Sequence, residues 1–250
     1  MTTPRRRPGR PRLGAPRIDG SDTAGDILDA ASELFATKGY SATTTRELAS
    51  AARISQATMY HYFPNKAAIL LKLLVDTVEP SVKLAREIEG EAPGRDPRAS
   101  LRRLVHSDAV LLLTTPWNNA ALYTLPEVQA PEFSGFHELR RALVGHYEKL
   151  GALVVADGGD AGPHGMSGPP TEPIDADAAA AIAPAAIALH RQRLRLPFHI
   201  VESAVRLRAE NAPTRDPHPL AAGLADIIAD TALAALAALD TGRGALGSPG

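Results

Sequence analysis

The chain has 250 residues, of which 44% are hydrophobic and 22% charged, and its formal net charge is −1. It is long enough for one large or two small domains with a real core, and this composition is ordinary for a soluble globular protein. The absence of cysteine excludes disulfides, thiolate metal sites and a cysteine nucleophile. The N-terminus lacks the apolar segment of a secretory signal, so we expect a cytoplasmic protein with no membrane partner.

Residues 1–20 form a basic arm that we expect to be disordered, because it has almost nothing to bury. Six of the first 17 residues are arginine and none is acidic, which leaves a net charge of −7 for the rest of the chain. Around Arg7, Arg10 and Arg12 the run Arg-Pro-Gly-Arg-Pro-Arg resembles an AT-hook, a motif that lies in the minor groove of A·T-rich DNA. The alternative is a solvated tail that adds only non-specific affinity.

Residues 21–88 are predicted to form a small helical domain that ends in a linker helix. Ile27, Ala31 and Phe35 belong to an apolar stripe at helical spacing, and Gly39 is a good stop for that first helix. The linker helix should begin at Lys66 and reach about Ile88, with Pro80 kinking or interrupting it.

Between these two helices lie two short ones joined by a tight turn at residues 52–54. Thr44 and Glu47 can form a capping box for the first, and Ser55 can cap the second. Such a pair is a helix-turn-helix, whose second helix can enter the DNA major groove. The alternative is an ordinary helical hairpin with a polar outer face. The outward side of the second helix carries neutral hydrogen-bonding groups suited to base edges and phosphates, namely Ser55, Gln56, Thr58, His61 and Tyr62.

Lys66 begins the next helix, where backbone N–H groups and the helix dipole favour an anion, so it is a candidate phosphate clamp. Tyr40 is expected in the core of this domain.

The segment from about Asp22 to Leu74 resembles the N-terminal domain of the TetR family of transcriptional regulators. The matching stretches are Gly39-Tyr40, Thr44–Ala49, Ile54–Phe63 and Asn65-Lys66. The family usually has glycine in the turn where this chain has Arg53, and a non-glycine residue with positive φ carries strain. The DNA-binding residues expected from the resemblance and the outward face are Thr44, Thr45, Arg46, Ser55, Gln56, Ala57, Thr58, Tyr60, His61, Tyr62 and Lys66. For Tyr60, a core position and a phosphate contact both remain open.

A polar loop at residues 89–95 is the expected domain boundary, and residues 96–240 are expected to form a larger helical domain. Apolar stripes predict helices at about 97–115, 132–156, 175–194, 198–210 and 220–239, with the helix at 175–194 weakened at Pro184. The glycine- and proline-rich stretch 157–173 is expected to be a flexible loop, and 241–250 a disordered tail. Since no useful strand-like alternation occurs, the predicted fold class is all-α.

The family resemblance implies that this second domain contains a ligand cavity. It also implies homodimerisation, with the last long helices of two copies forming a four-helix bundle. The stretch expected to line the cavity contains large or polar side chains that can equally be core residues: His106, Trp117, Tyr123, Phe136, His137 and Tyr147. Pockets are typically apolar with a few placed polar groups, so the expected effector is a mostly apolar small molecule.

The sequence gives little support to an enzyme. It contains no Gly-x-Ser-x-Gly, no P-loop and no His-Glu-x-x-His. His199 and Glu202 could share a helix face, but no third metal ligand is evident. We therefore expect no catalytic residue, no metal and no cofactor.

The sequence as a whole predicts a DNA-binding transcriptional regulator, acting as a repressor that a small-molecule effector releases from a palindromic operator in double-stranded DNA. One alternative is an architectural DNA-binding protein without an effector. Another is a helical small-molecule-binding protein with no nucleic-acid role.

Overall fold

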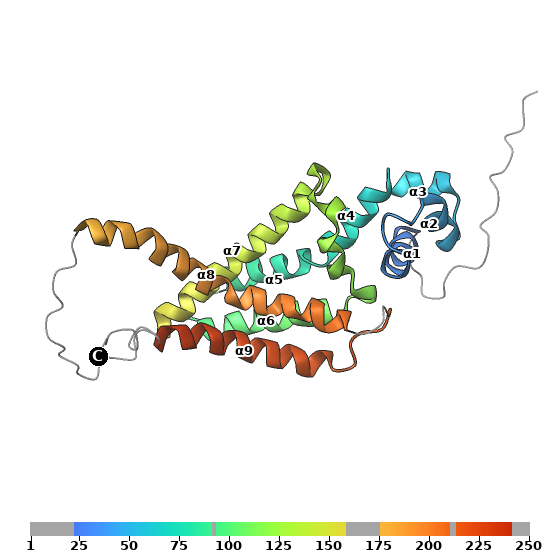
Figure 1. Cartoon of the computed structure of the whole chain (residues 1–250). Helices are drawn as coiled ribbons and strands as arrows, with labels where there is room; N and C mark the ends of the chain where they lie inside the picture. The colour runs from blue at the N-terminus through green and yellow to red at the C-terminus, as the bar shows by residue number, and fades with distance from the viewer. Residues whose placement is uncertain (1–22, 92–93, 159–175, 211–213, 242–250) are drawn as a thin grey trace, which may run out of the picture. The chain divides into compact units, whose positions relative to one another are not determined.

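The computed structural model of the protein describes residues 23–91, 94–158, 176–210 and 214–241, and every regular element in these ranges is a helix (Figure 1). The predicted all-α class is therefore confirmed. The chain divides into two compact units, Met1–Leu74 and Val75–Gly250. The predicted arm at 1–20, with Arg7, Arg10 and Arg12, lies outside the described residues, as do most of the loop 157–173 and nearly all of the tail 241–250.

The first unit is built from helices α1 (Thr23–Thr37), α2 (Thr45–Ala51), α3 (Gln56–Tyr62) and most of α4 (Lys66–Asp76). Tyr40 lies in the core as expected, with its ring edge-on to Phe35 at a centroid distance of 5.1 Å. The other large core side chains come from all four helices and include Ile27, Leu48, Met59, Ile69 and Leu70.

The predicted caps of α2 and α3 are present. Thr44 Oγ1 accepts from the Glu47 N–H at 3.3 Å, and Glu47 Oε2 accepts from the Thr44 N–H at 2.9 Å, which completes the capping box of α2. Ser55 Oγ accepts from the Thr58 N–H at 3.0 Å at the start of α3. Asn65 Oδ1 accepts from the Ala68 N–H at 2.8 Å at the start of α4. These side chains fix where each short helix begins.

The second unit contains five α-helices among its described residues: α5 (Glu79–Gly90), α6 (Pro97–Thr114), α7 (Ser134–Gly158), α8 (Ala176–Ala209) and α9 (Ala221–Thr241). Three short 3-10 helices, η1 (Pro116–Thr124), η2 (Pro126–Gln129) and η3 (Pro131–Phe133), connect α6 to α7, and each begins with a proline. Helix α6 packs against α5, α7, α8 and α9, so its apolar stripe forms the centre of the unit (Figure 1).

The division between the units lies earlier in the chain than the boundary expected at residues 89–95. Pro80 interrupts the expected linker helix, because α4 ends at Asp76 and α5 begins at Glu79 with Pro80 in its first turn. Helix α5 then packs on α6 and α7 and buries Val82, Ala85 and Ile88. This packing places α5 in the second unit.

Helix α8 differs from the prediction, which placed two helices at 175–194 and 198–210. It is continuous through Pro184 and Pro197. A proline inside a helix removes one backbone hydrogen bond and disfavours the helix. Pro197 is buried, as are Phe198, Val201 and Val205 in the following turns, so packing of this face against the rest of the unit compensates the lost bond.

Helix α9 includes an 18-residue stretch, Ala221–Ala238, which is long and apolar enough to cross a membrane by length and composition. In the structure it packs along α6 and α8 instead and buries Ala225, Ile228 and Leu236. One face of this helix therefore belongs to the core of the second unit.

Candidate nucleic-acid interface and ligand cavity

The exposed face of α3 brings together most of the residues predicted to contact DNA. Gln56, Ala57 and His61 are exposed, and the side chains of Tyr60 and Tyr62 are 47% and 46% exposed. Ser55 is also exposed at the start of this helix, and Thr58 is partly so. Thr44 and Arg46 are exposed at the start of α2.

Thr45 connects the start of α2 to α3. Its hydroxyl lies 3.1 Å from the Tyr60 hydroxyl and accepts a long hydrogen bond of 3.5 Å from Gln56 Nε2. The exposure of Tyr60 excludes the core position that the sequence left open. Its hydroxyl instead belongs to a polar surface shared by the two helices, where it can donate to a phosphate oxygen.

The turn between α2 and α3 requires a left-handed residue. Arg53 has φ 57°, in the region that favours glycine. This conformation lets the Arg53 N–H donate to Ser50 O at 3.1 Å and the Ile54 N–H to Ala49 O at 2.9 Å. The tight turn of the motif therefore forms without the glycine, at the cost of local backbone strain.

The contacts of the Lys66 side chain differ from those expected of a phosphate clamp. Its ammonium donates to Tyr40 O at 2.7 Å and to Thr43 O at 2.9 Å, and lies 4.2 Å from the centroid of the Tyr40 ring. These contacts turn the charge inward onto the loop that precedes α2. In this structure Lys66 positions that loop rather than presenting its charge outward.

Electrostatics also stabilise the start of α2. A hydrogen bond from Lys38, joined by those from Thr44, lowers the pKa of Glu47 to about 2. The Glu47 carboxylate of the capping box therefore stays ionised in any mild acid, and its charge lies at the end of the helix where the dipole favours it.

A cavity of about 30 Å³ lies in the second unit, with room for about two water molecules. Its wall is mostly apolar and consists of Val78, Leu112, Ala120, Phe136, Leu143, Phe198, Val201 and Val205. The polar or amphipathic side chains that line it are Thr77, Asp108, Tyr123, Arg140 and Glu202.

Two of the six predicted pocket residues, Tyr123 and Phe136, line this cavity. The ring nitrogen Nε2 of His137 is bonded to Val128 O at 2.8 Å, and that of His106 lies 3.6 Å from the Asp226 carboxylate. Neither lines the cavity, because each side chain is directed to another partner.

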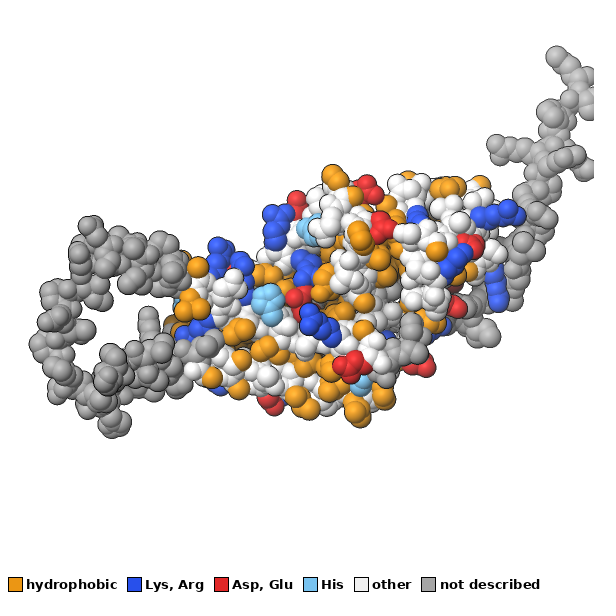
Figure 2. All heavy atoms as spheres, viewed as in Figure 1, with side chains coloured by type: hydrophobic (Ala, Val, Ile, Leu, Met, Phe, Trp, Pro, Cys, Tyr) orange, Lys and Arg blue, Asp and Glu red, His pale blue; other side chains and the backbone are white. Residues whose placement is uncertain are grey.

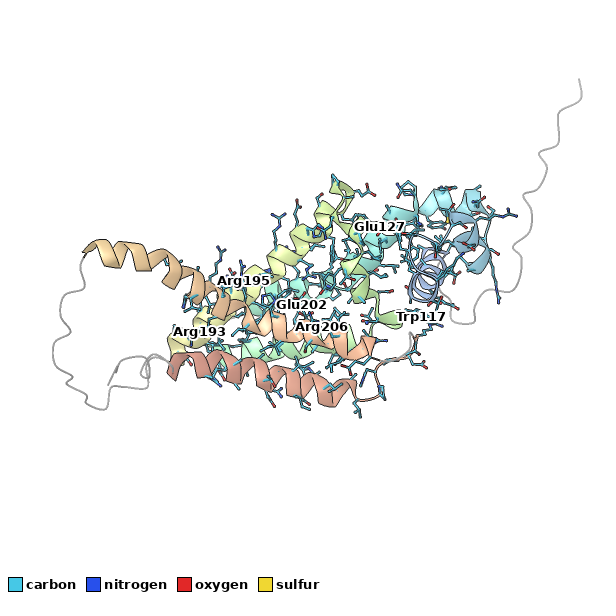
Figure 3. The ribbon with its side chains drawn as sticks, viewed as in Figure 1. Trp117, Glu127, Arg193, Arg195, Glu202 and Arg206 are labelled. Carbon is cyan, nitrogen blue, oxygen red and sulfur yellow. The ribbon has the colours of Figure 1, made fainter. Side chains whose placement is uncertain are left out.

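Trp117 also lies outside the cavity wall, and Figure 3 shows it well away from Glu202, which is part of the wall. Its backbone has φ 56°, and its N–H donates to Thr214 O at 3.0 Å. The following residue, Asn118, has φ 52° and donates from Nδ2 to Val205 O at 3.0 Å. These bonds hold η1 against the end of α8.

Tyr147 is fully buried and does not line the cavity, but it is hydrogen-bonded to Asp108, which does. The Tyr147 hydroxyl donates to Asp108 Oδ2 at 2.9 Å, and the Ser81 hydroxyl donates to Asp108 Oδ1 at 2.8 Å. Burial raises the pKa of Asp108 to about 6, against the opposing effect of these two hydrogen bonds. Burial likewise raises the pKa of Tyr147 well above its ordinary value, so its hydroxyl is a donor at neutral pH.

Arg140 and Glu202 form an ion pair in the same cavity wall. The guanidinium carbon of Arg140 also lies 4.5 Å from the centroid of the Tyr123 ring and 5.5 Å from that of Phe198. A guanidinium over aromatic faces gains cation–π stabilisation. The guanidinium of Arg140 is therefore an organic cation that the protein itself places in the cavity wall.

The sequence analysis did not predict that Asp108, Arg140 and Glu202 line the cavity. For Asp108 a signal was present, because it interrupts an apolar stripe of α6 that continues through Leu104 and Leu112. A charged residue on a buried helix face needs partners, and here they come from α5 and α7. For Arg140 and Glu202 no comparable signal exists, because each also fits an exposed helix surface.

The possible metal pair, His199 and Glu202, has no third ligand among the described residues. His199 Nδ1 lies 3.4 Å from Glu202 Oε2, and Glu202 is engaged by Arg140. Within the described part of the chain, no group of three or more His, Asp or Glu residues could hold a metal ion.

Comparison with known proteins assigns the first unit. Residues 27–73 match the family model described as "Bacterial regulatory proteins, tetR family". The transcriptional repressor KstR2 of Rhodococcus jostii is 38% identical over 93 residues, which cover 36% of this chain and 45% of that protein. The transcriptional regulator EthR of Mycolicibacterium smegmatis is 36% identical over 90 residues, 35% of this chain and 40% of that protein. These alignments span less than half the length of each curated relative.

The likeness to a solved structure extends over both units. The crystal structure of Mycobacterium smegmatis AmtR superposes with a TM-score of 0.68 at 33% identity, covering 89% of each chain. The chain therefore belongs to the tetR family of bacterial regulatory proteins, and its first unit is the helix-turn-helix domain of that family.

Proposed function

We propose that this protein is a cytoplasmic transcriptional repressor which binds a palindromic operator as a homodimer and is released by a small-molecule effector. Its family consists of DNA-binding regulators rather than enzymes. Repression is the proposed sign of regulation because KstR2 of Rhodococcus jostii, which shares the helix-turn-helix domain, is named a repressor.

The observation that carries the proposal is the exposed face of α3. A short helix begins at a fixed N-cap and presents Gln56, Ala57 and His61 to solvent, beside the polar pair of Tyr60 and Thr45. Side-chain amides and hydroxyls recognise base edges and phosphates. We assign base contacts to Gln56, Ala57, Thr58 and His61. Phosphate contacts are assigned to Thr44, Thr45, Arg46, Ser55, Tyr60 and Tyr62.

Helix α9 supports the homodimer. One of its faces, which we call the α9 face, consists of Gly223, Ile227, Thr231, Ala234 and Ala238, all exposed. Small residues at this spacing allow two helices to approach closely. Ile187 and Leu189 on α8 are 67% and 73% exposed, and Figure 2 shows apolar side chains spread along the visible surface of this region. A second copy covering these side chains would remove them from water.

The cavity supports an effector. It is mostly apolar with a few charged groups, which is the usual composition of a small-molecule site. An effector weakens DNA binding only if it binds better to the conformation that does not fit the operator. The small volume of the cavity means that binding must move side chains, and such movement provides a difference between conformations.

Selection of binding sites from a random duplex library tests this proposal. The full-length protein at roughly physiological salt should enrich a palindrome whose half-sites lie about 34–36 Å apart, since two α3 helices of a dimer would read them. Enrichment of A·T-rich DNA without symmetry would instead favour an architectural protein acting through the arm. Failure to bind any duplex would favour a small-molecule-binding protein with no nucleic-acid role.

A further inference from the structure

We propose that the cavity of the second unit selects a small organic cation with an apolar body, which lies against Asp108, Glu202 and the aromatic wall. The inference rests on the proposed effector role of this cavity and names the chemical class of the effector.

The charges in the wall favour a cation. Two carboxylates, those of Asp108 and Glu202, line the cavity together with a single guanidinium, that of Arg140. Arg140 is paired with Glu202. The hydrogen bonds that Asp108 accepts from described residues come from the neutral hydroxyls of Ser81 and Tyr147. A fully buried carboxylate without a bonded cation is costly, and a positively charged ligand would remove that cost.

The placement of Arg140 shows that the wall accommodates such a group. Its guanidinium pairs with Glu202 and lies over the rings of Tyr123 and Phe198. These are the contacts that a ligand ammonium or guanidinium group would use. A ligand cation that takes this position would displace the Arg140 side chain and so enlarge the cavity beyond its about 30 Å³.

An anion fits the same wall poorly. To reach Arg140, an anion would have to break the Arg140–Glu202 ion pair. The Glu202 carboxylate would then be unpaired near Asp108, and the anion would repel both carboxylates. A neutral apolar molecule would gain the contacts of Phe136, Leu143 and Val201 but would bring no positive charge to Asp108, which then keeps only the attraction of Arg140, the partner of Glu202.

A matched set of ligands separates these classes. Hexylammonium, hexan-1-ol and hexanoate share one alkyl chain and differ in charge. Each is added at the same millimolar concentration to the full-length protein at pH 7.5, and the Tm and the calorimetric Kd are measured. Hexylammonium should raise the Tm most. Asp108→Asn keeps the shape of the side chain without its charge, and its amide oxygen can still accept one of the two hydroxyl hydrogen bonds. This variant should weaken hexylammonium binding by about tenfold or more.

Two further variants complete the test. Glu202→Gln removes the second carboxylate and should also weaken hexylammonium binding, which covers the case in which Asp108→Asn does not fold. Asp226→Asn removes a carboxylate on α9 that does not line the cavity, and should leave hexylammonium binding unchanged.

The outcomes distinguish the ligand class from the proposed function. Stabilisation by hexanoate or hexan-1-ol equal to that by hexylammonium, or a full response in both cavity variants, would overturn the cation assignment, as would no response to any of the three. Fluorescence anisotropy of a labelled operator duplex on the same samples reports the function separately. Hexylammonium that binds without weakening operator binding would support the cavity chemistry and contradict the effector role.

Discussion

At the scale of single residues, Arg53 shows that the motif tolerates a departure from the family pattern. The turn needs a left-handed residue, and this chain meets that need with φ 57° at a residue that has a Cβ atom. The cost of a left-handed conformation is roughly 1–2 kcal/mol for a residue other than glycine. The departure therefore changes stability and leaves the turn in place.

Comparison of Arg53→Gly with Arg53→Ala isolates this strain, because both variants lose the arginine side chain. Arg53→Gly should be the more stable of the two by about 1 kcal/mol, the reverse of the usual order of alanine and glycine. Urea denaturation measures the difference. A more stable alanine variant would mean that the turn relaxes to negative φ in solution.

Asp108 makes stability depend on pH. Its pKa is raised in the folded protein to about 6 from the ordinary 3.8, so the folded state holds this proton more tightly than the unfolded state. Its contribution to stability is fully present below pH 3.8 and is lost as the pH rises through 6, a change of about 3 kcal/mol.

The variant Asp108→Asn removes this titration. We expect the difference in unfolding free energy between Asp108→Asn and the wild type to grow in favour of the variant between pH 4 and pH 7. Urea denaturation at several pH values in that range measures it. A difference that does not change with pH would show that Asp108 titrates near its ordinary value in the folded protein.

At the scale of helices, local chemistry was predictable and long-range packing was not. The capping residues Thr44, Ser55 and Asn65 act on N–H groups three residues away, so the sequence alone located the starts of α2, α3 and α4. The continuity of α8 between residues 194 and 198 depends instead on burial of Phe198 and Val201 against other helices, and this burial overrode the break predicted there.

Lys66 is the predicted DNA-site residue whose contacts in the structure differ from those expected of a phosphate clamp. If its ammonium mainly holds the Tyr40 and Thr43 carbonyls, Lys66→Met should destabilise the first unit by about 1–3 kcal/mol. Lys72→Met, at an exposed position on the same helix, is the matched control and should have a small effect. Thermal denaturation reports the result. Unchanged stability with uniformly weaker DNA binding would restore the phosphate-clamp interpretation.

The division of labour on α3 makes a second prediction at this scale. Gln56→Ala should relax base preference at the positions it contacts, with a loss of about 1–3 kcal/mol on the preferred duplex only. Tyr60→Phe removes the hydroxyl next to Thr45 and should weaken binding to all duplexes alike. Anisotropy titrations on preferred and scrambled duplexes separate the two effects. A uniform loss for Gln56→Ala would mean that other side chains read the bases.

At the scale of the whole molecule, the first unit could be predicted because its motif is continuous in sequence. The cavity could not be predicted, because its polar network joins residues from separate helices: Ser81 of α5, Asp108 of α6 and Tyr147 of α7. Of the predicted pocket residues, Tyr123 and Phe136 line the cavity and Trp117 does not. Large side chains in the sequence identified a stretch of chain that contributes to the cavity wall, but they did not identify which of those side chains face the cavity.

The proposal that a homodimer reads two half-sites is the central claim, and it has one direct test. The affinity and stoichiometry of the full-length protein are measured on the selected palindrome and on the same duplex with one half-site scrambled, at one salt concentration. We predict two protomers on the palindrome and binding at least about 100-fold weaker to the scrambled duplex, because specific and non-specific affinities differ by several orders of magnitude. Equal affinity for both duplexes would contradict the account and favour an architectural DNA-binding protein.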